Sequence, residues 1–228
     1  MIMKKFLSLL LVLLLMLPAA ALADTKIAVN GSATVQAEPD MLTLSLGVEE
    51  RKGDVAAVQA LVNEKIAAVV EALKNAGIDE KDIQTGYYSI YNSYNYDDPD
   101  NMQYVASCSL NVIVRELSKA GEMIDVAVAA GANQVGGVTF GVSDLTALQD
   151  KALEMAVADG IRRAGVMAKA AGVTLPALPE SVVENSSYYG DYKGSAYTMN
   201  ADAGAPTSLM GGMVNVTSSV TVTYEAND

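Results

Sequence analysis

The sequence predicts an α+β protein, with an antiparallel sheet and helices packed on one face of it. Two observations predict this class: several segments alternate apolar and polar residues, as strands with one buried face do, and others repeat apolar residues every three or four positions, as amphipathic helices do. A third is their order, which predicts a ferredoxin-like β-α-β-β-α-β core followed by a long helix and two further strands. The clean alternation favours antiparallel strands, because buried parallel strands are apolar on both faces.

The N-terminal segment has the three parts of a secretory signal peptide. Lys4 and Lys5 supply positive charge, residues 6–17 form an apolar run, and Ala21-Leu22-Ala23 is a small-residue cleavage site. The apolar run is shorter than the ~20 residues of a membrane-spanning helix. We therefore predict cleavage after Ala23, one domain over residues 24–228 without a transmembrane segment, and export to the periplasm or the cell exterior.

The mature chain is strongly acidic. The full sequence has a net charge of −12, and without Lys4 and Lys5 it keeps 13 basic residues against 27 acidic ones, a net charge of −14. A phosphate backbone repels such a chain, which argues against nucleic-acid binding. Cys108 is the single cysteine, so packing and not an intrachain disulfide must hold the core.

The first half of the mature chain begins with two strand segments, residues 27–35 and 42–48, with a bend at Glu38-Pro39-Asp40 between them. Asp54 is placed to cap the N-terminus of a helix, and Gly77 to end it. An apolar stripe at helical spacing runs between these two residues: Val58, Val62, Ile66, Val69 and Leu73. A polar connection, residues 78–83, leads to the next strand.

The next strand is rich in tyrosine: residues 84–96 read QTGYYSIYNSYNY. Alternation places Tyr87 and Tyr91 on one face, and Tyr88, Ile90, Tyr94 and Tyr96 on the other. A turn at residues 96–101 leads into a return strand at residues 104–115, whose apolar face includes Cys108. These two strands are predicted to form a hairpin.

The second half continues with a helix from Ser118, its predicted N-cap, to Gly131, and a glycine-rich strand at residues 134–142. Asp144 is placed to cap a long alanine-rich helix that ends near Ala171, with Gly172 as its stop. A strand is predicted at residues 181–189 and a last alternating strand at residues 214–224. Residues 190–212 have no periodicity and are predicted to be a mobile loop.

Short motifs spread in order along nearly the whole mature chain resemble the SIMPL-domain family, which includes the YggE-like exported bacterial proteins. The motifs are Gly31-Ser32-Ala33-Thr34-Val35 with Pro39-Asp40, Leu46-Gly47-Val48-Glu49, Gly77-Ile78, Lys81-Asp82-Ile83-Gln84-Thr85, Gly131-Ala132-Asn133, and Thr139-Phe140 with Val142-Ser143-Asp144. Asp159-Gly160 departs from the family pattern, which has a helix-favouring alanine at the second position. The resemblance implies an extracytoplasmic protein of poorly defined molecular function. Some members are associated with stress tolerance or oligomeric assemblies, and none offers catalytic residues to transfer.

The residues needed for common catalytic and cofactor chemistry are missing. The sequence has no histidine, which excludes a serine–histidine–acid triad and removes the commonest zinc ligand. It also lacks the glycine-rich phosphate and dinucleotide motifs. We therefore predict no enzyme activity, no catalytic residue, no cofactor and no metal site.

Three sharper hypotheses each compete with a simpler one. Asp97, Asp98 and Asp100 could bind calcium, but the run lacks the glycine and distal glutamate of an EF-hand, so a solvated turn is preferred. Cys108 could be a redox thiol, but its apolar face favours a buried small hydrophobe. The pairs Glu49-Glu50 and Asp79-Glu80 could do acid–base work, but strand neighbours face opposite ways and the second pair lies in a turn.

The tyrosines remain as candidates for a contact surface. Tyrosine packs well across strands, and it is also enriched at protein interfaces. For the tyrosines of the hairpin, packing within the sheet is the preferred interpretation. For those of the irregular segment, a protein interface is preferred. The candidate interface residues are Tyr87, Tyr91, Tyr188, Tyr189, Tyr192 and Tyr197.

The function predicted from the sequence is therefore that of an exported, non-enzymatic protein. It would act by self-assembly, as a homo-oligomer, or by binding a protein partner, and the resemblance implies a role in envelope stress tolerance. The alternative is an envelope protein with a ligand- or metal-binding site lined by carboxylates and tyrosines.

Overall fold

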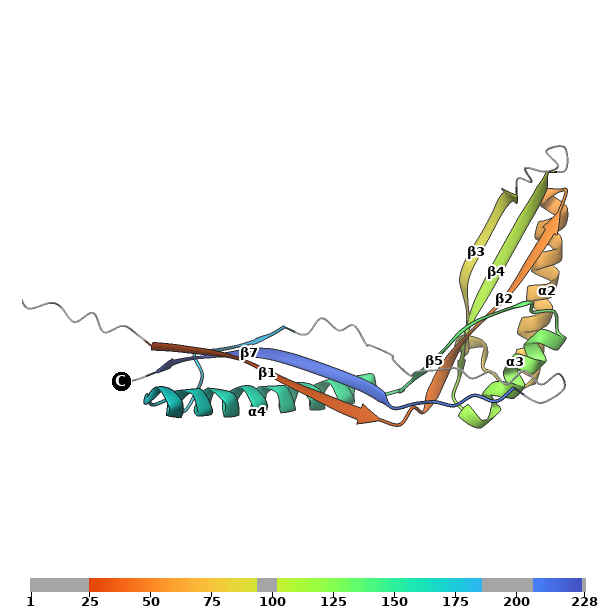
Figure 1. Ribbon diagram of the computed structural model, residues 1–228. Coiled ribbons are helices and arrows are strands. Elements are labelled where there is room, and N and C mark those ends of the chain that lie inside the picture. The colour runs from red at the N-terminus through yellow and green to blue at the C-terminus, as the bar shows by residue number, and fades with distance from the viewer. Residues whose placement is uncertain (1–24, 94–101, 186–206, 227–228) are drawn as a thin grey trace, which may run out of the picture.

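The computed structural model describes residues 25–93, 102–185 and 207–226. The described chain forms two antiparallel sheets that meet at an angle, giving the molecule the L-shaped outline of Figure 1. We call the limb with the three-stranded sheet the arm, and the limb with the four-stranded sheet the head.

The arm consists of one helix and a sheet with the order β1-β7-β6. Its strands are β1 (Thr25–Ala37), β6 (Ser181–Glu184) and β7 (Val214–Ala226), and its helix is α4 (Leu145–Ala171). β1 and β7 pair along all thirteen residues of each, from Thr25 opposite Ala226 to Ala37 opposite Val214. The arm is therefore closed by the first and last strands of the described chain.

The head carries the β-α-β-β-α-β order that the sequence predicted, within residues 41–141. Its elements are β2 (Met41–Lys52), α2 (Val55–Asn75), the short 3-10 turn η1 (Glu80–Asp82), β3 (Ile83–Ser93), β4 (Gln103–Val114), a second turn η2 (Leu117–Lys119), α3 (Ala120–Ala129) and β5 (Gln134–Gly141). The sheet order is β3-β4-β2-β5, with each neighbouring pair antiparallel. The α+β class and the β3–β4 hairpin are confirmed, while the ferredoxin-like label stays a prediction.

The number of sheets differs from the expectation of one. β2 is paired on one side with β4 and on the other with β5, so neither of its edges is left for β1. The chain turns at Glu38-Pro39-Asp40, and β1 finds its partner in β7 instead. Local alternation predicts each strand, but the pairing of residues nearly 200 positions apart leaves no local signal.

The helix ends are mostly those predicted. Asp54 accepts a hydrogen bond from the Ala57 amide at 2.8 Å, and Asp144 accepts one from the Ala147 amide at 3.0 Å. α4 ends at Gly172, and Gly77 follows α2, both with the left-handed backbone that glycine tolerates. Ser118 was wrong as the N-cap of α3: it lies inside η2, and α3 begins after Lys119, which gives no side-chain cap.

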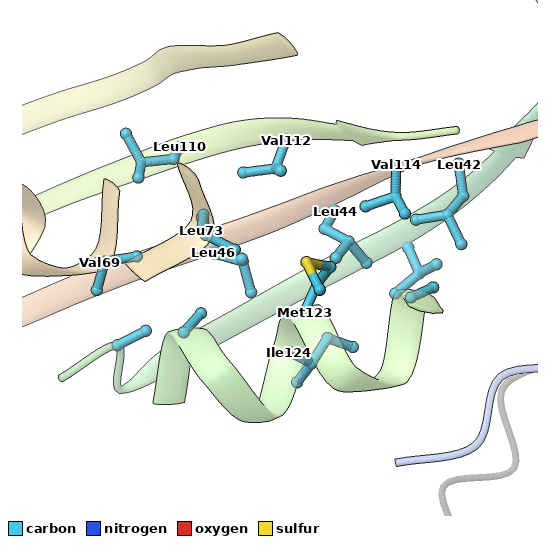
Figure 2. Packing of buried hydrophobic residues seen from close by; sticks show 14 of the residues in the cluster. Leu42, Leu44, Leu46, Val69, Leu73, Leu110, Val112, Val114, Met123 and Ile124 are labelled. Atoms are coloured by element: carbon cyan, nitrogen blue, oxygen red, sulfur yellow. The ribbon is translucent and has the colours of Figure 1, made fainter. Parts of the chain in front are cut away.

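The head core lies between the sheet and the two helices (Figure 2). β2 supplies Leu42, Leu44 and Leu46, and β4 supplies the facing row Leu110, Val112 and Val114. These meet Val69 and Leu73 from α2 and Met123 and Ile124 from α3, as Figure 2 shows. Because both helices cover the same face, no described helix covers the other face of this sheet.

The arm packs through small residues instead of large ones. α4 turns a stripe of Ala152, Ala156, Gly160, Ala164 and Ala168 toward β1 and β7. A Cβ added at Gly31 would lie 2.2 Å from the carbonyl oxygen of Ala156, so strand and helix are in backbone contact there. This close approach gives the departure at Asp159-Gly160 a reason, since a Cβ at Gly160 would lie 2.6 Å from a methyl group of Val222.

Head and arm are joined by connections that are tied to their surroundings. Asp40 accepts hydrogen bonds from the backbone amide and the hydroxyl of Ser143, at 2.7 and 2.6 Å, which links the β1–β2 and β5–α4 connections. The segment before β7 crosses α3, where the Thr207 hydroxyl donates to Asp125 at 2.7 Å. Among the described residues, no helix is both long and apolar enough to span a membrane.

Candidate functional site: the open face of the head sheet

Two candidate tyrosines lie together on the face of the head sheet that the helices leave open. In β3, Tyr87 and Tyr91 point away from α2, and their side chains are 58% and 50% exposed. Tyr88 points to the opposite face, where its hydroxyl lies 3.5 Å from the side-chain oxygen of Asn63 on α2. The predicted division of the tyrosines between two faces is therefore confirmed for these three residues.

The surface around the two tyrosines carries small side chains and one ion pair, Glu49 with Arg51. Tyr87 stands opposite Ser109 on β4, Ser89 opposite Ser107, and Tyr91 opposite Val105. Thr43 and Ser45 continue the same face on β2. Of these residues, the two exposed tyrosines are the ones typical of a protein contact surface, because tyrosine is enriched at such surfaces.

The tyrosines also stand on an edge strand. Among the described strands β3 pairs only with β4, so no described strand lies on its outer side, and such an edge is a common template for contact with another chain. Its register shifts between Thr85 and Tyr87, where Gly86 lies close to the Asn111 side chain. Such a bulge increases local twist and changes the direction in which the following side chains point.

Only two of the six candidate interface residues are described by the structure. Tyr188, Tyr189, Tyr192 and Tyr197 lie outside the described residues, as do Asp97, Asp98 and Asp100 of the calcium hypothesis. Of the predicted mobile loop, residues 207–212 are described, and Thr207 and Leu209 contact the head there. The interface and loop predictions on the remaining residues stay predictions.

The other candidate chemistries look unfavourable where the structure describes them. Cys108 is buried beside Val48 and Val58, and burial raises the pKa of its thiol, which disfavours the reactive thiolate. Glu49 and Glu50 lie on opposite faces of β2, as predicted: Glu50 pairs with Lys65 on α2, and Glu49 with Arg51. In the described ranges, no group of three or more histidine, cysteine, aspartate or glutamate residues is arranged to hold a metal ion.

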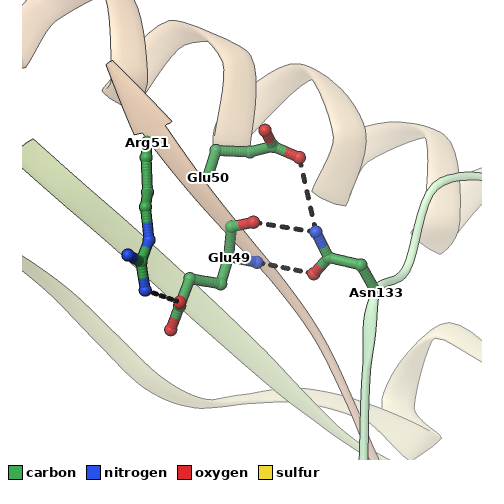
Figure 3. A network of polar contacts seen from close by, with 4 residues as sticks. All are labelled: Glu49, Glu50, Arg51 and Asn133. Atoms are coloured by element: carbon green, nitrogen blue, oxygen red, sulfur yellow. Dashed lines mark hydrogen bonds and ion pairs between the residues drawn. The ribbon is translucent and has the colours of Figure 1, made fainter. Parts of the chain in front are cut away.

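Asn133 had no predicted role beyond its place in a motif, and the structure supplies one (Figure 3). Its side-chain oxygen accepts from the Glu49 amide, and its side-chain nitrogen donates to the Glu49 carbonyl, both at 2.8 Å. The backbone amide of Asn133 also donates to the Gly47 carbonyl at 3.0 Å. Asn133 thus continues the β2–β5 ladder with its side chain, at the position where β5 begins. In the sequence, the signal for this role was that Asn133 directly precedes a predicted strand.

Asp82 is a second residue that the sequence placed only in a polar connection. It is buried, and the Arg115 guanidinium at the end of β4 donates to both of its carboxylate oxygens, at 2.8 and 3.0 Å. This bidentate pair lowers the pKa of Asp82 and joins η1 to β4. This ion pair has a structural role, because it holds the beginning of β3, the strand that carries Tyr87 and Tyr91.

Comparison with known proteins agrees with the motifs. Over 162 residues the chain is 36% identical to the 26 kDa periplasmic immunogenic protein of Brucella melitensis. This alignment covers 68% of this chain and 65% of that protein. It is 33% identical to the Uncharacterized protein YggE of Edwardsiella ictaluri over 149 residues, and 31% identical to that of Escherichia coli K12 over 144 residues.

These alignments cover 64% and 62% of this chain, respectively, and 62% and 58% of the two YggE proteins. The chain therefore spans less than two thirds of the length of these relatives. A family model described as SIMPL, a protein of unknown function (DUF541), matches residues 27–224. Because this match runs from β1 to β7, through both head and arm, the chain belongs to the SIMPL (DUF541) family.

Proposed function

We propose that the protein is exported and acts without catalysis, by binding a protein partner or further copies of itself through the open face of the head sheet. The observation that carries the proposal is the exposure of Tyr87 and Tyr91 on the same face of an edge strand, with Ser89 between them. Large, stiff aromatic side chains cost little conformational entropy when a partner covers them, and they dominate many interfaces.

Several features support a non-catalytic role. The sequence has no histidine, and its single cysteine is buried. Asp82, Asp159 and Glu50 are each paired with a cation, as structural carboxylates usually are. Export is supported by the signal-like N-terminal sequence and by a relative whose name describes it as periplasmic. A contribution to envelope stress tolerance remains part of the proposal, and survival of a deletion strain under oxidative or osmotic stress would test it.

The first experiment measures the mass of the exported protein by light scattering across a concentration series. The chain is expressed with its own N-terminal segment and purified from the exported fraction, and its intact mass shows whether cleavage occurred after Ala23. We expect a mass above that of one chain, and a lower mass for the double variant Tyr87→Ser/Tyr91→Ser. Tyr88→Ser is the matched control, because it removes a tyrosine from the opposite face of the same strand.

Two outcomes would each contradict a part of the proposal. A mass of one chain at every concentration refutes self-assembly. An assembly that the double variant leaves unchanged, or that Tyr88→Ser disrupts equally, refutes the role of the open face.

A further inference from the structure

A hollow on the arm lies between the outer side of β1 and one flank of α4. It is lined by residues 28–30 of the strand and by Arg162, Arg163, Val166 and Met167 of the helix. Its volume is about 420 Å³, which falls within the ~300–1,000 Å³ of sites that bind small molecules. Val166 and Met167 are 60% and 48% exposed, so the described chain leaves the apolar part of the hollow uncovered.

The charged part and the apolar part of the hollow follow one another along α4. Val166 and Met167 come about one helical turn after Arg162 and Arg163, which separates the two parts by about 6 Å along the helix axis. The apolar part is the one nearer the end of α4, at the end of the arm that points away from the head (Figure 1). A molecule that fits the hollow therefore has a polar head at one end and an apolar chain at the other.

The charged part already holds a carboxylate of the protein itself. Arg162 donates to Asp159 at 2.6 Å, Nε of Arg163 lies 2.7 Å from its other oxygen, and the Ser32 amide donates to that oxygen at 3.2 Å. The hydrogen bond from Arg162 is the main reason why the pKa of Asp159 is lowered, so this carboxyl group is ionised at neutral pH. Two guanidinium groups against one carboxylate leave one positive charge in excess.

This excess of positive charge extends along the second half of α4. Residues 160–171 contain Arg162, Arg163 and Lys169 and no acidic residue, although the chain has a net charge of −12. An arginine side chain carries several N–H donors, and the contacts with Asp159 leave some of them unused within the described part of the chain. The charge of the hollow is therefore complementary to an anionic group and repels a cationic one.

We propose that the hollow binds a single-chain amphiphile with a carboxylate head, of which a fatty acid is the simplest. The carboxylate lies at Arg162 and Arg163, and the acyl chain runs over Val166 and Met167 toward the end of the arm. One apolar strip beside one excess positive charge matches one acyl chain with one negative charge. The site is separate from the open face of the head, so the inference goes beyond the proposed function and does not depend on it.

The test measures the binding of dansyl-labelled undecanoic acid to the exported full chain by fluorescence. Dodecanoate then displaces this probe, at concentrations below those at which it forms micelles. We expect saturable binding with one site per chain, weakened by added salt because the head group is held by charge. Dodecanol has the same chain without the charge and should displace the probe about tenfold less well, and dodecyltrimethylammonium should not displace it.

Two sets of variants locate the site. Val166→Ser/Met167→Ser should weaken the binding of dodecanoate about tenfold, because the acyl chain loses most of its apolar contact. Ile161→Ser is the matched control, because Ile161 is 44% exposed on the same helix and does not line the hollow. Circular dichroism checks that each variant is folded.

Asp159→Asn gives a result that damage to the fold cannot imitate. The new amide oxygen can still accept the hydrogen bond from Ser32, while both guanidinium groups lose their competing carboxylate. We expect about 3- to 10-fold tighter binding of dodecanoate and unchanged binding of dodecanol. Arg162→Gln/Arg163→Gln should weaken dodecanoate binding by a similar factor, and Lys151→Gln, which removes a cation of α4 outside the hollow, should leave it unchanged.

Each of the other results overturns the inference. If dodecanol displaces the probe as well as dodecanoate does, the protein adsorbs apolar chains without a site for the carboxylate. If Ile161→Ser or Lys151→Gln weakens binding as much as the hollow variants do, the site lies elsewhere. If Asp159→Asn fails to tighten binding, the excess charge does not hold the ligand. If phosphatidylglycerol vesicles bind but the free acid does not, the ligand is a membrane surface and the proposed fatty-acid site is wrong.

Discussion

The contact between β1 and α4 gives the sharpest test of the arm. Gly31→Ala would place a methyl group 2.2 Å from the Ala156 carbonyl oxygen and 2.4 Å from the Gly160 amide nitrogen. Both are backbone atoms, so rotating a side chain cannot relieve the clash, and the helix must move outward. Overpacking of this kind costs about 1–3 kcal/mol, and the upper half of that range applies because the neighbours are rigid.

A smaller, favourable effect acts on the unfolded chain, because alanine has fewer conformations to lose than glycine, about 0.4–1 kcal/mol. The net expectation is a loss of about 2 kcal/mol in the free energy of unfolding, and a melting temperature lower by about 4–8 °C for a domain of this size. Thermal and urea unfolding followed by circular dichroism measure both quantities.

Gly165→Ala on α4 is the matched control. A Cβ there meets no atom within 4 Å, so the substitution only improves a helix position and should stabilise by about 0.5–1 kcal/mol. Opposite signs for the two variants support the close packing. A Gly31→Ala protein as stable as the wild type would refute it.

Three further predictions concern single contacts. Asp82 has a lowered pKa in the folded protein, so its stabilising contribution is present above about pH 4 and is lost as the pH falls through the folded pKa. The variant Arg115→Gln should therefore have a lower free energy of unfolding at pH 7, and it should lose less further stability between pH 5 and pH 2 than the wild type does. Urea unfolding at each pH measures both effects. Asn133→Ala should lower the free energy of unfolding by about 1–3 kcal/mol, because the Glu49 backbone loses two partners, and equal melting curves would contradict its role. Ser218 is fully buried with no partner for its hydroxyl within the described chain, so Ser218→Ala should raise stability by about 1 kcal/mol in the same assay.

Much of the fold could be predicted from local patterns. Asp54 and Asp144 mark the helix starts because a carboxylate before an apolar helical stripe satisfies a free amide, and that geometry needs only neighbouring residues. The faces of β3 and β4 followed from alternation alone, including the opposite directions of Tyr87 and Tyr88. The N-cap predicted at Ser118 was wrong because η2 precedes α3 and moves the cap to Lys119, a difference of one residue that sequence patterns seldom resolve.

The unpredicted features depend on distant residues. Nothing local distinguishes a β1 that pairs with β7 from a β1 that continues into the head sheet. Asp82 and Arg115 are 33 positions apart, and Asn133 and Glu49 are 84 apart, so neither pair leaves a spacing that a motif would show. For the candidate surface, the sequence predicted which tyrosines share a face, but not that the open face of an edge strand would carry them.

The pairing of β1 with β7 has a consequence for the order of folding. The head is built from one continuous stretch, residues 41–141, and can form its sheet while later residues are still being delivered. The arm cannot, because Thr25 must wait for Ala226 before the first and last strands can join. Contacts between such distant residues form slowly. We therefore expect the exported chain to pass through a stage with a folded head and an open arm, during which the edges of β1 and β7 are exposed to whatever receives the chain.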